Sequence, residues 1–381
     1  MKIVVKFKNL LARVSRRINY VGRLTGPLTE SVLFEAFSGK QIGDSPLAIA
    51  IELQKSHPEL KLYWSSASGN PELPEGMTAL RHGSPSWYRA LATSKFLVNN
   101  ANFPAYFRKR EGQIYLQTWH GTPLKLIGLD IRNNRTSAVY QQTMEREAGY
   151  WDYLLSPSAY CTEILPKAFA TKAKVLELGY PRNDSLNNVS AETRAAIRRK
   201  LGVADPKQKL VLYAPTWRDH SRGSKGGWES VNYLSQETKL PDGFTLLFRG
   251  HANTHASHQA INTAAVIDVT FYPNIADLFI AADVLVTDYS SVMFDFSATG
   301  KPIIFLTPDL KEYEADRGFY FDFRTHAPGP ICSTAQEVNQ ALVDADANQT
   351  AFAKKYAAWI DKFNPKDDGQ VAKRVVNTVW N

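Results

Sequence analysis

Two histidines and one serine-rich turn are the residues with the clearest capacity for chemistry in this sequence. His120 follows a predicted strand at residues 114–119, and His251 follows a predicted strand at residues 245–248. A histidine at the carboxyl end of a parallel strand lies where ligands bind, and its ring titrates near neutral pH. His120 is therefore either a general base or a histidine bonded to a loop carbonyl, and this segment alone favours neither.

The serine-rich turn lies in the segment VLVTDYSSVMFDFSATGKPIIF, residues 284–305. The segment reads as a buried strand, a polar turn, a helix that ends at Gly300 and a second buried strand. Such a turn places unpaired backbone N–H groups and the positive end of a helix dipole at the sheet edge. Ser290 and Ser291 are therefore predicted to hold an anion, although a plain N-cap explains these serines equally well.

Alternating strand and helix patterns must position these motifs. The alternation runs from residue 31 to residue 178, and it restarts at residues 210–214. This order predicts α/β domains with parallel sheets and helices on both faces. A length of 381 residues suits two such domains. We predict domains at residues 25–195 and 207–360, followed by a C-terminal helical segment at residues 361–381.

Composition narrows the class of protein. The formal net charge is +8 and the pI is near 9.2, which indicates an anionic partner. Basic residues gather at the amino terminus and beside strand ends, not in stripes with aromatic residues, so nucleic acid is not an expected partner. The two cysteines lie far apart without metal-ligand spacing, which argues against a disulfide framework or a zinc site. No apolar run is long enough to span a bilayer.

Residues 1–24 form a segment of their own. The first 23 positions hold seven basic residues and no acidic residue, and apolar residues recur there at three- and four-residue steps. This pattern predicts a basic amphipathic helix that makes peripheral contact with an anionic membrane surface. The same pattern is also typical of a terminal helix that docks on the body of the protein.

Four segments, in order along the chain, resemble the signature blocks of one enzyme family. They are QTWHGTPLK at residues 117–125, LYAPTWRD at 212–219, FRGH at 248–251 and VTDYSSVMFDF at 286–296. Together they resemble the CDP-glycerol glycerophosphotransferase family of wall teichoic acid synthesis. The resemblance implies an α/β GT-B fold, in which two Rossmann-like domains face each other and the active site lies in the interdomain cleft.

The same resemblance implies a reaction. It is the transfer of glycerol phosphate from CDP-glycerol to a hydroxyl of a lipid-linked polyprenyl diphosphate acceptor, with release of CMP. A CDP-ribitol donor, a capsule-type polyol or sugar phosphate transferase, and a GT-B nucleotide-sugar enzyme are the alternatives. The short segment before the first block leaves open whether one unit is added or many.

Each candidate residue has an expected role in that reaction. His120 is expected to be the general base that takes the proton of the acceptor hydroxyl. His251 is expected to bind pyrophosphate, with protonation of the leaving CMP as the alternative. The remaining substrate-binding candidates are polar residues near strand ends in both halves: Thr122, Lys125, Arg218, Arg249, Asn274, Asp288, Ser290, Ser291 and Asp295.

Some of these candidates have equally good structural explanations. Asp288 and Asp295 are expected either to bind the ribose or glycerol hydroxyls of the donor, or to cap and pair within the protein. Asp288 orienting a histidine is a further alternative. Asn274 is expected either to meet the cytidine or to begin a helix. No cluster of histidines and carboxylates has metal-ligand spacing, so no protein-bound metal is expected, and Mg²⁺ carried by the donor stays open.

Overall fold

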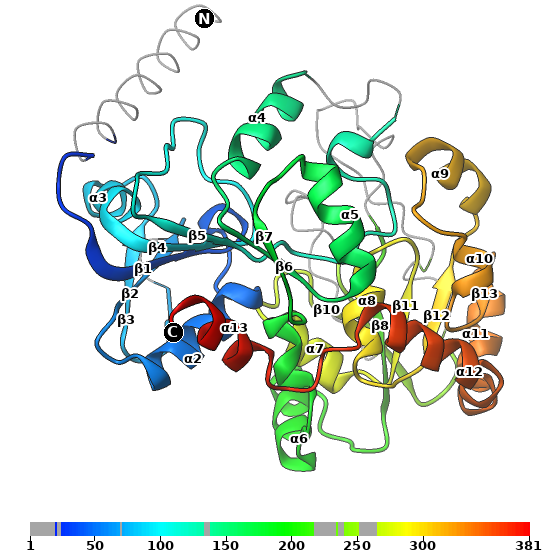
Figure 1. Cartoon of the computed structure of the whole chain (residues 1–381). Helices are drawn as coiled ribbons and strands as arrows, with labels where there is room; N and C mark the ends of the chain where they lie inside the picture. The colour runs from blue at the N-terminus through cyan, green and yellow to red at the C-terminus, as the bar shows by residue number, and fades with distance from the viewer. Residues whose placement is uncertain are drawn as a thin grey trace, which may run out of the picture.

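The computed structural model describes residues 20, 24–68, 71–132, 138–216, 234, 240–250 and 265–381. Most of the predicted segment 1–24, together with Arg218 and His251, lies outside these residues. Two parallel sheets dominate the described part, and helices cover their faces (Figure 1). Within the described ranges, no helix is long and apolar enough to cross a membrane.

The first sheet has seven parallel strands among the described residues, in the order β3-β2-β1-β4-β5-β6-β7. This is the order of a doubly wound nucleotide-binding domain, in which ligands bind where the strand order reverses. That reversal lies between β1 and β4, so the carboxyl ends of these strands border the crevice. The strands are β1 (Thr29–Glu35), β2 (Lys61–Ser66), β3 (Met77–Arg81), β4 (Ser94–Asn99), β5 (Ile114–Gln117), β6 (Tyr153–Ser156) and β7 (Lys174–Glu177).

Helices cover both faces of the first sheet. On one face α3, α4 and α5 share a core that contains Trp87 and Phe169. On the other face α2 and α13 share a core that contains Leu53 and Val376. The last helix of the chain therefore returns to the first sheet, where it lies beside α2 (Figure 1). These helices are α2 (Asp44–Ser56), α3 (Pro85–Thr93), α4 (Ala138–Ala148), α5 (Ala159–Phe169) and α13 (Val371–Val379).

The second sheet has six parallel strands in the described part, in the order β10-β9-β8-β11-β12-β13. All four residues of β11 and all four of β12 are buried, as expected for central parallel strands covered on both faces. The strands are β8 (Lys209–Tyr213), β9 (Phe244–Phe248), β10 (Val266–Asp268), β11 (Val284–Thr287), β12 (Ile303–Leu306) and β13 (Ile331–Cys332). The helices are α6 (Ala191–Lys200), α7 (Ile275–Ala281), α8 (Val292–Ser297), α9 (Leu310–Arg317), α10 (Phe323–His326), α11 (Ala335–Val343) and α12 (Ala345–Phe363).

Polar residues at helix starts explain where several helices begin. Ser84, Ser190 and Thr334 each accept, through the side-chain oxygen, a hydrogen bond from the backbone N–H three residues later. Such a cap typically stabilises a helix by about 1 kcal/mol. In α6 the first turn carries Glu192 and the last turn carries basic residues, which complements the helix dipole.

The expected parallel sheets are confirmed, but several element bounds differ from those predicted. β3 was not predicted, because only one of its five residues is buried and no apolar run marks it. The helix after the serine-rich turn ends at Ser297, not at Gly300. The short helix α8 therefore has six residues, which limits the dipole it offers to an anion.

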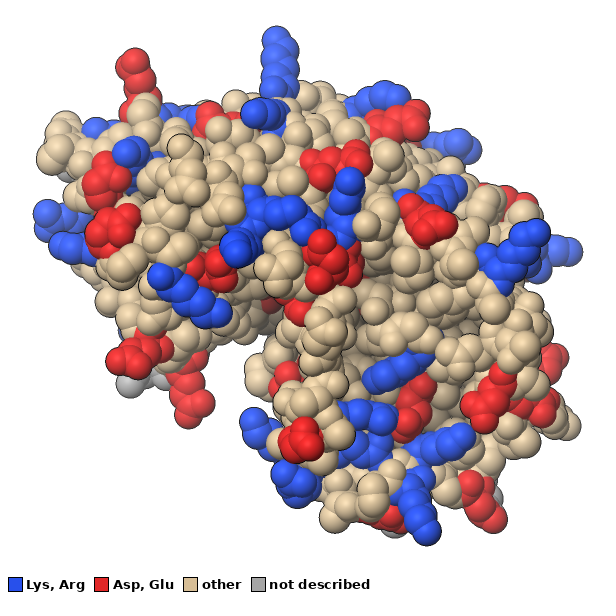
Figure 2. Space-filling view, turned by 60° about the horizontal axis from the view of Figure 1, so that its bottom comes forward, with Lys and Arg blue, Asp and Glu red and all other residues tan. Residues whose placement is uncertain are grey.

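Charged residues of both signs are interspersed over the face shown in Figure 2, which has a recess between two lobes. The net positive charge of the chain is thus not gathered into one patch on this face. We therefore expect an anionic ligand to bind through local contacts at strand ends and not on an extended basic surface.

Candidate active site

His120 follows β5 at a sharp bend of the backbone. Trp119 has a φ of +53°, a left-handed conformation that is uncommon for a bulky residue. The His120 ring packs against Trp119 and Phe37, with ring centroids 4.1 and 5.7 Å apart. Its Nδ1 lies 2.5 Å from the carbonyl oxygen of Asn100. Because a carbonyl only accepts, the proton of the neutral ring is on Nδ1 and Nε2 is left to accept another.

The bond to Asn100 reconciles the two explanations that the sequence allowed for His120. A carbonyl partner fixes the orientation of the ring, and an oriented neutral imidazole is what a general base requires. Burial lowers the pKa of His120, and the hydrogen bond to Asn100 opposes this effect. The neutral form, which accepts a proton, is therefore favoured at neutral pH.

A buried carboxylate at the end of β1 supports the loop that holds the histidine. Glu35 accepts hydrogen bonds from Ser65 Oγ at 2.6 Å and from Asn99 Nδ2 at 3.5 Å. Asn100 Oδ1 accepts from the backbone N–H of Phe37 at 2.8 Å. The Phe37–Asn100 bond joins the loop after β1 to the loop after β4, and the Glu35 bonds tie the ends of β1, β2 and β4 together. Burial raises the pKa of Glu35 to about 7. Sequence reasoning missed this residue, although a glutamate that ends an apolar strand was the available signal.

The two halves of the molecule meet where Gly121 faces Ser291. A Cβ built on Gly121 would lie 3.0 Å from Ser291 Oγ and 3.1 Å from Ser291 Cβ. A larger residue here would require Ser291 to move by a few tenths of an ångström. The residue after His120 therefore contacts the serine-rich turn before α8. The Ser291 side chain makes no capping hydrogen bond to α8, so the plain N-cap explanation does not hold for it.

A buried guanidinium crosses between the halves beside this contact. Arg182 donates from Nε and Nη2 to the two carboxylate oxygens of Asp295, at 2.9 and 3.2 Å. Its Nη1 donates to Asp44 Oδ1 at 3.2 Å. Burial alone would lower the pKa of Arg182, but Asp295 and Asp44 raise it above its ordinary value. Asp295 therefore serves as an ion-pair partner here, the second of its two expected roles.

Asp288 shapes the serine-rich turn. It is buried, and its Oδ1 accepts from the backbone N–H groups of Thr216 and Tyr289 at 2.7 and 2.6 Å. These bonds tie the end of β8 to the end of β11. The structure thus shows the capping role that the sequence allowed for Asp288, and it places this carboxylate under the turn that carries Ser290.

Arg249 and Asn274 hold the backbone around β10 and α7. Arg249 Nη1 donates to the carbonyl oxygens of Val269 and Tyr272 at 3.2 and 2.9 Å, and burial lowers its pKa. The side chain of Asn274 accepts from the backbone N–H of Ala276, which is the helix-start role expected as an alternative. These contacts explain both side chains by their structural roles and give no evidence that either one binds a ligand.

The loop that carries His120 continues into contact with the second half. Thr122 is buried, and Lys125 pairs in an antiparallel bridge with Phe319. The backbone N–H of Tyr320 donates to the carbonyl of Leu124 at 2.9 Å. This pairing fixes the exit of the loop, just as Asn100 fixes its entry. Among the described residues, no group of three or more His, Cys, Asp or Glu side chains is arranged to hold a metal ion.

Similarity to known proteins shows the family of this chain. The family model described as CDP-Glycerol:Poly(glycerophosphate) glycerophosphotransferase matches residues 23–381. The chain belongs to this family. The family inferred from four short segments is thereby confirmed, and the chain is an enzyme of this glycerophosphotransferase family.

Relatives in this family differ in how much of their length this chain covers. The teichoic acid poly(glycerol phosphate) polymerase of Bacillus subtilis (strain 168) is 34% identical over an alignment of 395 positions, which covers 100% of this chain and 52% of the relative. The protein of the same name in Bacillus spizizenii is 36% identical over 98% of both chains. The teichoic acid glycerol-phosphate transferase of Staphylococcus aureus is 35% identical over 93% of this chain and 94% of the relative. The chain thus spans about half of the first relative and nearly all of the other two.

Solved structures of the wall teichoic acid polymerase TagF share the fold of this family member. One has a TM-score of 0.88 at 32% identity and covers 100% of this chain and 96% of its own. A histidine variant of TagF soaked with CDPG has a TM-score of 0.87 at 31% identity, over 99% of this chain and 97% of its own. The predicted GT-B class, with two facing Rossmann-like domains, is confirmed.

Proposed function

We propose that this protein transfers glycerol phosphate from CDP-glycerol to a hydroxyl of a lipid-linked acceptor and releases CMP in teichoic acid biosynthesis. The observation that carries the proposal is the contact between Gly121 and Ser291. It sets the loop of an oriented, neutral histidine against a serine-rich turn at the carboxyl edge of the second sheet. Family membership supplies the class of donor.

His120 is the proposed general base. As the acceptor oxygen attacks the β-phosphorus of the donor, His120 Nε2 takes the hydroxyl proton. The new phosphorus–oxygen bond forms while the bond to CMP breaks, and CMP leaves with the electron pair. A positioned base of this kind typically contributes about 10²–10⁴-fold to the rate.

The second half is proposed to hold the donor pyrophosphate. Phosphoryl transfer depends mainly on alignment and on neutralising charge at the phosphate oxygens. The hydroxyls of Ser290 and Ser291 and the backbone N–H groups at the start of α8 are the proposed donors of hydrogen bonds. Arg218 and His251 keep their predicted roles in phosphate binding, and both lie outside the described residues.

A glycerol donor is favoured over a ribitol donor. The glycerol-phosphate polymerases and transferase of the three species above are 34–36% identical to this chain. A teichoic acid ribitol-phosphate primase of Bacillus spizizenii is 26% identical and a ribitol-phosphate polymerase of Staphylococcus aureus is 25% identical. We therefore expect CDP-glycerol to be used in preference to CDP-ribitol.

The proposed place of action is the cytoplasmic face of the cell membrane. The basic amphipathic pattern of residues 1–24 and a lipid-linked acceptor both support peripheral attachment there. The proposed reaction uses no protein-ligated metal, and Mg²⁺ carried by the donor would act through the pyrophosphate. Comparing turnover before and after chelation of divalent cations tests this point.

The decisive assay combines the protein with a lipid-linked disaccharide analogue and either CDP-glycerol or CDP-ribitol. We expect CMP release and a matching gain in product mass with CDP-glycerol. His120→Ala should lower the rate by about 10²–10⁴-fold. His57→Ala is the matched control, because His57 directly follows α2 and its ring nitrogens hydrogen-bond to Ser56 and Asn381, far along the chain from the His120 loop.

Two results would overturn the proposal. Absence of CMP release with both donors would remove the assigned reaction. Full activity of His120→Ala would remove the assigned base while leaving the donor assignment intact.

A further inference from the structure

A second recess lies between the two halves, away from the catalytic contact. It is a pocket of about 750 Å³, and neither His120 nor Ser291 lines it. Its walls come from α5 and the end of β7 in the first half, and from residues 320–321, α12 and residues 365–366 in the second. The volume falls in the range of roughly 300–1,000 Å³ that is usual for small-molecule sites, which often lie at domain interfaces.

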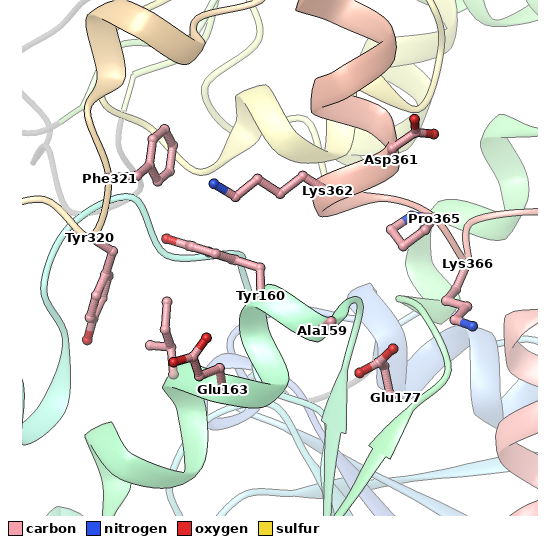
Figure 3. Close-up of a pocket in the computed structure, with 11 residues that line it drawn as sticks. Ala159, Tyr160, Glu163, Glu177, Tyr320, Phe321, Asp361, Lys362, Pro365 and Lys366 are labelled. Atoms are coloured by element: carbon pink, nitrogen blue, oxygen red, sulfur yellow. The ribbon is translucent and has the colours of Figure 1, made fainter.

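Aromatic rings frame one end of this pocket. Tyr160, Tyr320 and Phe321 surround it, and the Lys362 side chain extends from α12 toward Tyr160 and Phe321 (Figure 3). The Lys362 ammonium lies 5.4 Å from the ring centroid of Tyr160 and 5.1 Å from that of Phe321. The rings hold the ammonium in place, so the pocket presents flat apolar surfaces beside a fixed hydrogen-bond donor.

The charges in the lining argue against an ionic ligand. The carboxylates of Glu163, Glu177 and Asp361 outnumber the ammonium groups of Lys362 and Lys366 by one. A phosphate would meet three carboxylates and a cation would meet two ammonium groups, so neither kind of ion finds a lining of the opposite sign. A neutral ligand with many hydroxyls avoids both penalties, because carboxylates accept and ammonium groups donate hydrogen bonds to hydroxyls.

We propose that this pocket binds a saccharide unit of the acceptor, at a distance from the reacting hydroxyl. The inference rests on the proposed function for the identity of the acceptor, but not for the chemistry of the pocket. A sugar ring would lie with an apolar face on the tyrosine and phenylalanine rings, and its hydroxyls would reach Glu163, Asp361 and Lys362.

The pocket is joined directly to the loop that carries the proposed base. The Tyr160 hydroxyl donates to the carbonyl of Pro123 at 2.7 Å, and the Tyr320 backbone N–H donates to the carbonyl of Leu124 at 2.9 Å. A saccharide held between these tyrosines would contact the residues that fix the loop after His120. Acceptor binding would thereby stabilise the arrangement of the two halves that brings the base to the donor.

The test measures saccharide binding by the full chain in the absence of any donor. Isothermal titration calorimetry with the neutral disaccharides N,N′-diacetylchitobiose and cellobiose should show saturable binding of at least one. The double substitution Glu163→Ala with Asp361→Ala should weaken it at least tenfold. Both side chains are exposed, so folding should not suffer. The matched control is Glu59→Ala with Glu312→Ala, which removes two exposed carboxylates elsewhere.

Inorganic phosphate serves as the opposing probe. If the pocket were an anion site, removing two carboxylates would strengthen phosphate binding, whereas a saccharide site predicts the same phosphate affinity in both proteins, set by the proposed pyrophosphate site in the second half. Tighter phosphate binding by the variant, binding of neither disaccharide, or unchanged disaccharide affinity in the variant would each overturn the proposal. Turnover of CDP-glycerol is measured separately, so failure of the saccharide subsite and failure of the proposed reaction are distinguishable.

Discussion

Removing Arg182 is the perturbation with the largest expected effect outside the catalytic histidine. Its guanidinium makes three hydrogen bonds, at 2.9, 3.2 and 3.2 Å, to one carboxylate in each half. The side chains of Arg182, Asp44 and Asp295 keep only 9, 11 and 14% of their exposure. Arg182→Ala would leave two nearly buried carboxylates without their cationic partner.

The expected loss of unfolding free energy is about 3–5 kcal/mol, the usual result of removing one partner of a buried ion pair. Three charge-assisted hydrogen bonds, at roughly 1.5–3 kcal/mol each, would give a larger gross figure. Desolvation of the three charges offsets part of it, so the lower range is the better expectation. Urea unfolding measures this value, provided that circular dichroism and tryptophan fluorescence give coincident transitions.

The substitution should also lower the rate constant kcat. Asp295 belongs to α8, whose first turn meets Gly121. If the pair is lost, α8 can shift relative to the His120 loop, and a displacement of about 1 Å can lower a rate by about 10²-fold. CDP-glycerol turnover at saturating substrate measures this effect.

A charge-neutral triple substitution is the matched control: Arg182→Met with Asp44→Asn and Asp295→Asn. It removes the same ion pairs but leaves no unpaired carboxylate, so it should be clearly more stable than Arg182→Ala. Equal stability of the two variants would refute the reasoning from buried charge. Full activity of Arg182→Ala would refute the link between this pair and the catalytic contact.

Three further perturbations address other parts of the molecule. Gly121→Ala should lower kcat by up to about 10²-fold, because its Cβ would lie 3.0 Å from Ser291 Oγ. The pKa of Glu35 is raised from 4.5 to about 7, so the folded chain keeps a proton in this window that the unfolded chain releases. The contribution of Glu35 to stability should therefore fall by roughly 3 kcal/mol as pH rises from about 4.5 to about 7, and Glu35→Gln should remove that contribution in urea unfolding. Deleting residues 1–23 should abolish sedimentation with anionic vesicles while turnover of a soluble acceptor analogue persists.

Each of these three has its own control or contrary result. Gly43→Ala is the control for Gly121, since a Cβ there would meet no atom within 4 Å. Glu147 has its own burial-raised pKa of about 7, so the pH slope in Glu35→Gln should shrink without vanishing; an unchanged slope would contradict the assignment. Continued sedimentation of the truncated protein would place membrane contact elsewhere in the chain.

Local patterns in the sequence predicted the parts of the site that lie at strand ends. The strand–turn–helix pattern around Ser291 and the histidine after β5 both depend on short-range signals, and topology then brings them to the same cleft. The partners of Arg182 could not be predicted this way, because 138 and 113 residues separate it from Asp44 and Asp295. No periodicity spans such distances.

Residues with two short-range explanations were the hardest to assign. Asn274 is a helix cap, and such an asparagine looks the same in sequence whether or not a ligand lies beside it. Asp288 likewise accepts a hydrogen bond from the backbone N–H of Tyr289. The sequence allowed this capping role, but it did not distinguish it from ligand binding. Glu35 was missed for a different reason: a glutamate at the end of an apolar strand is visible in the sequence, but its burial depends on packing of distant segments.

The return of α13 to the first sheet makes the first half discontinuous in sequence. Val371, Val375, Val376 and Val379 of this helix fill the core beneath α2, which otherwise would expose apolar surface. The second half is thus an insertion between two parts of the first. During synthesis, the first half cannot complete its core until nearly the whole chain has left the ribosome, while the inserted half can fold before then. The described part of the chain crosses between the halves twice, so any change in the angle between the halves must bend both of these connections.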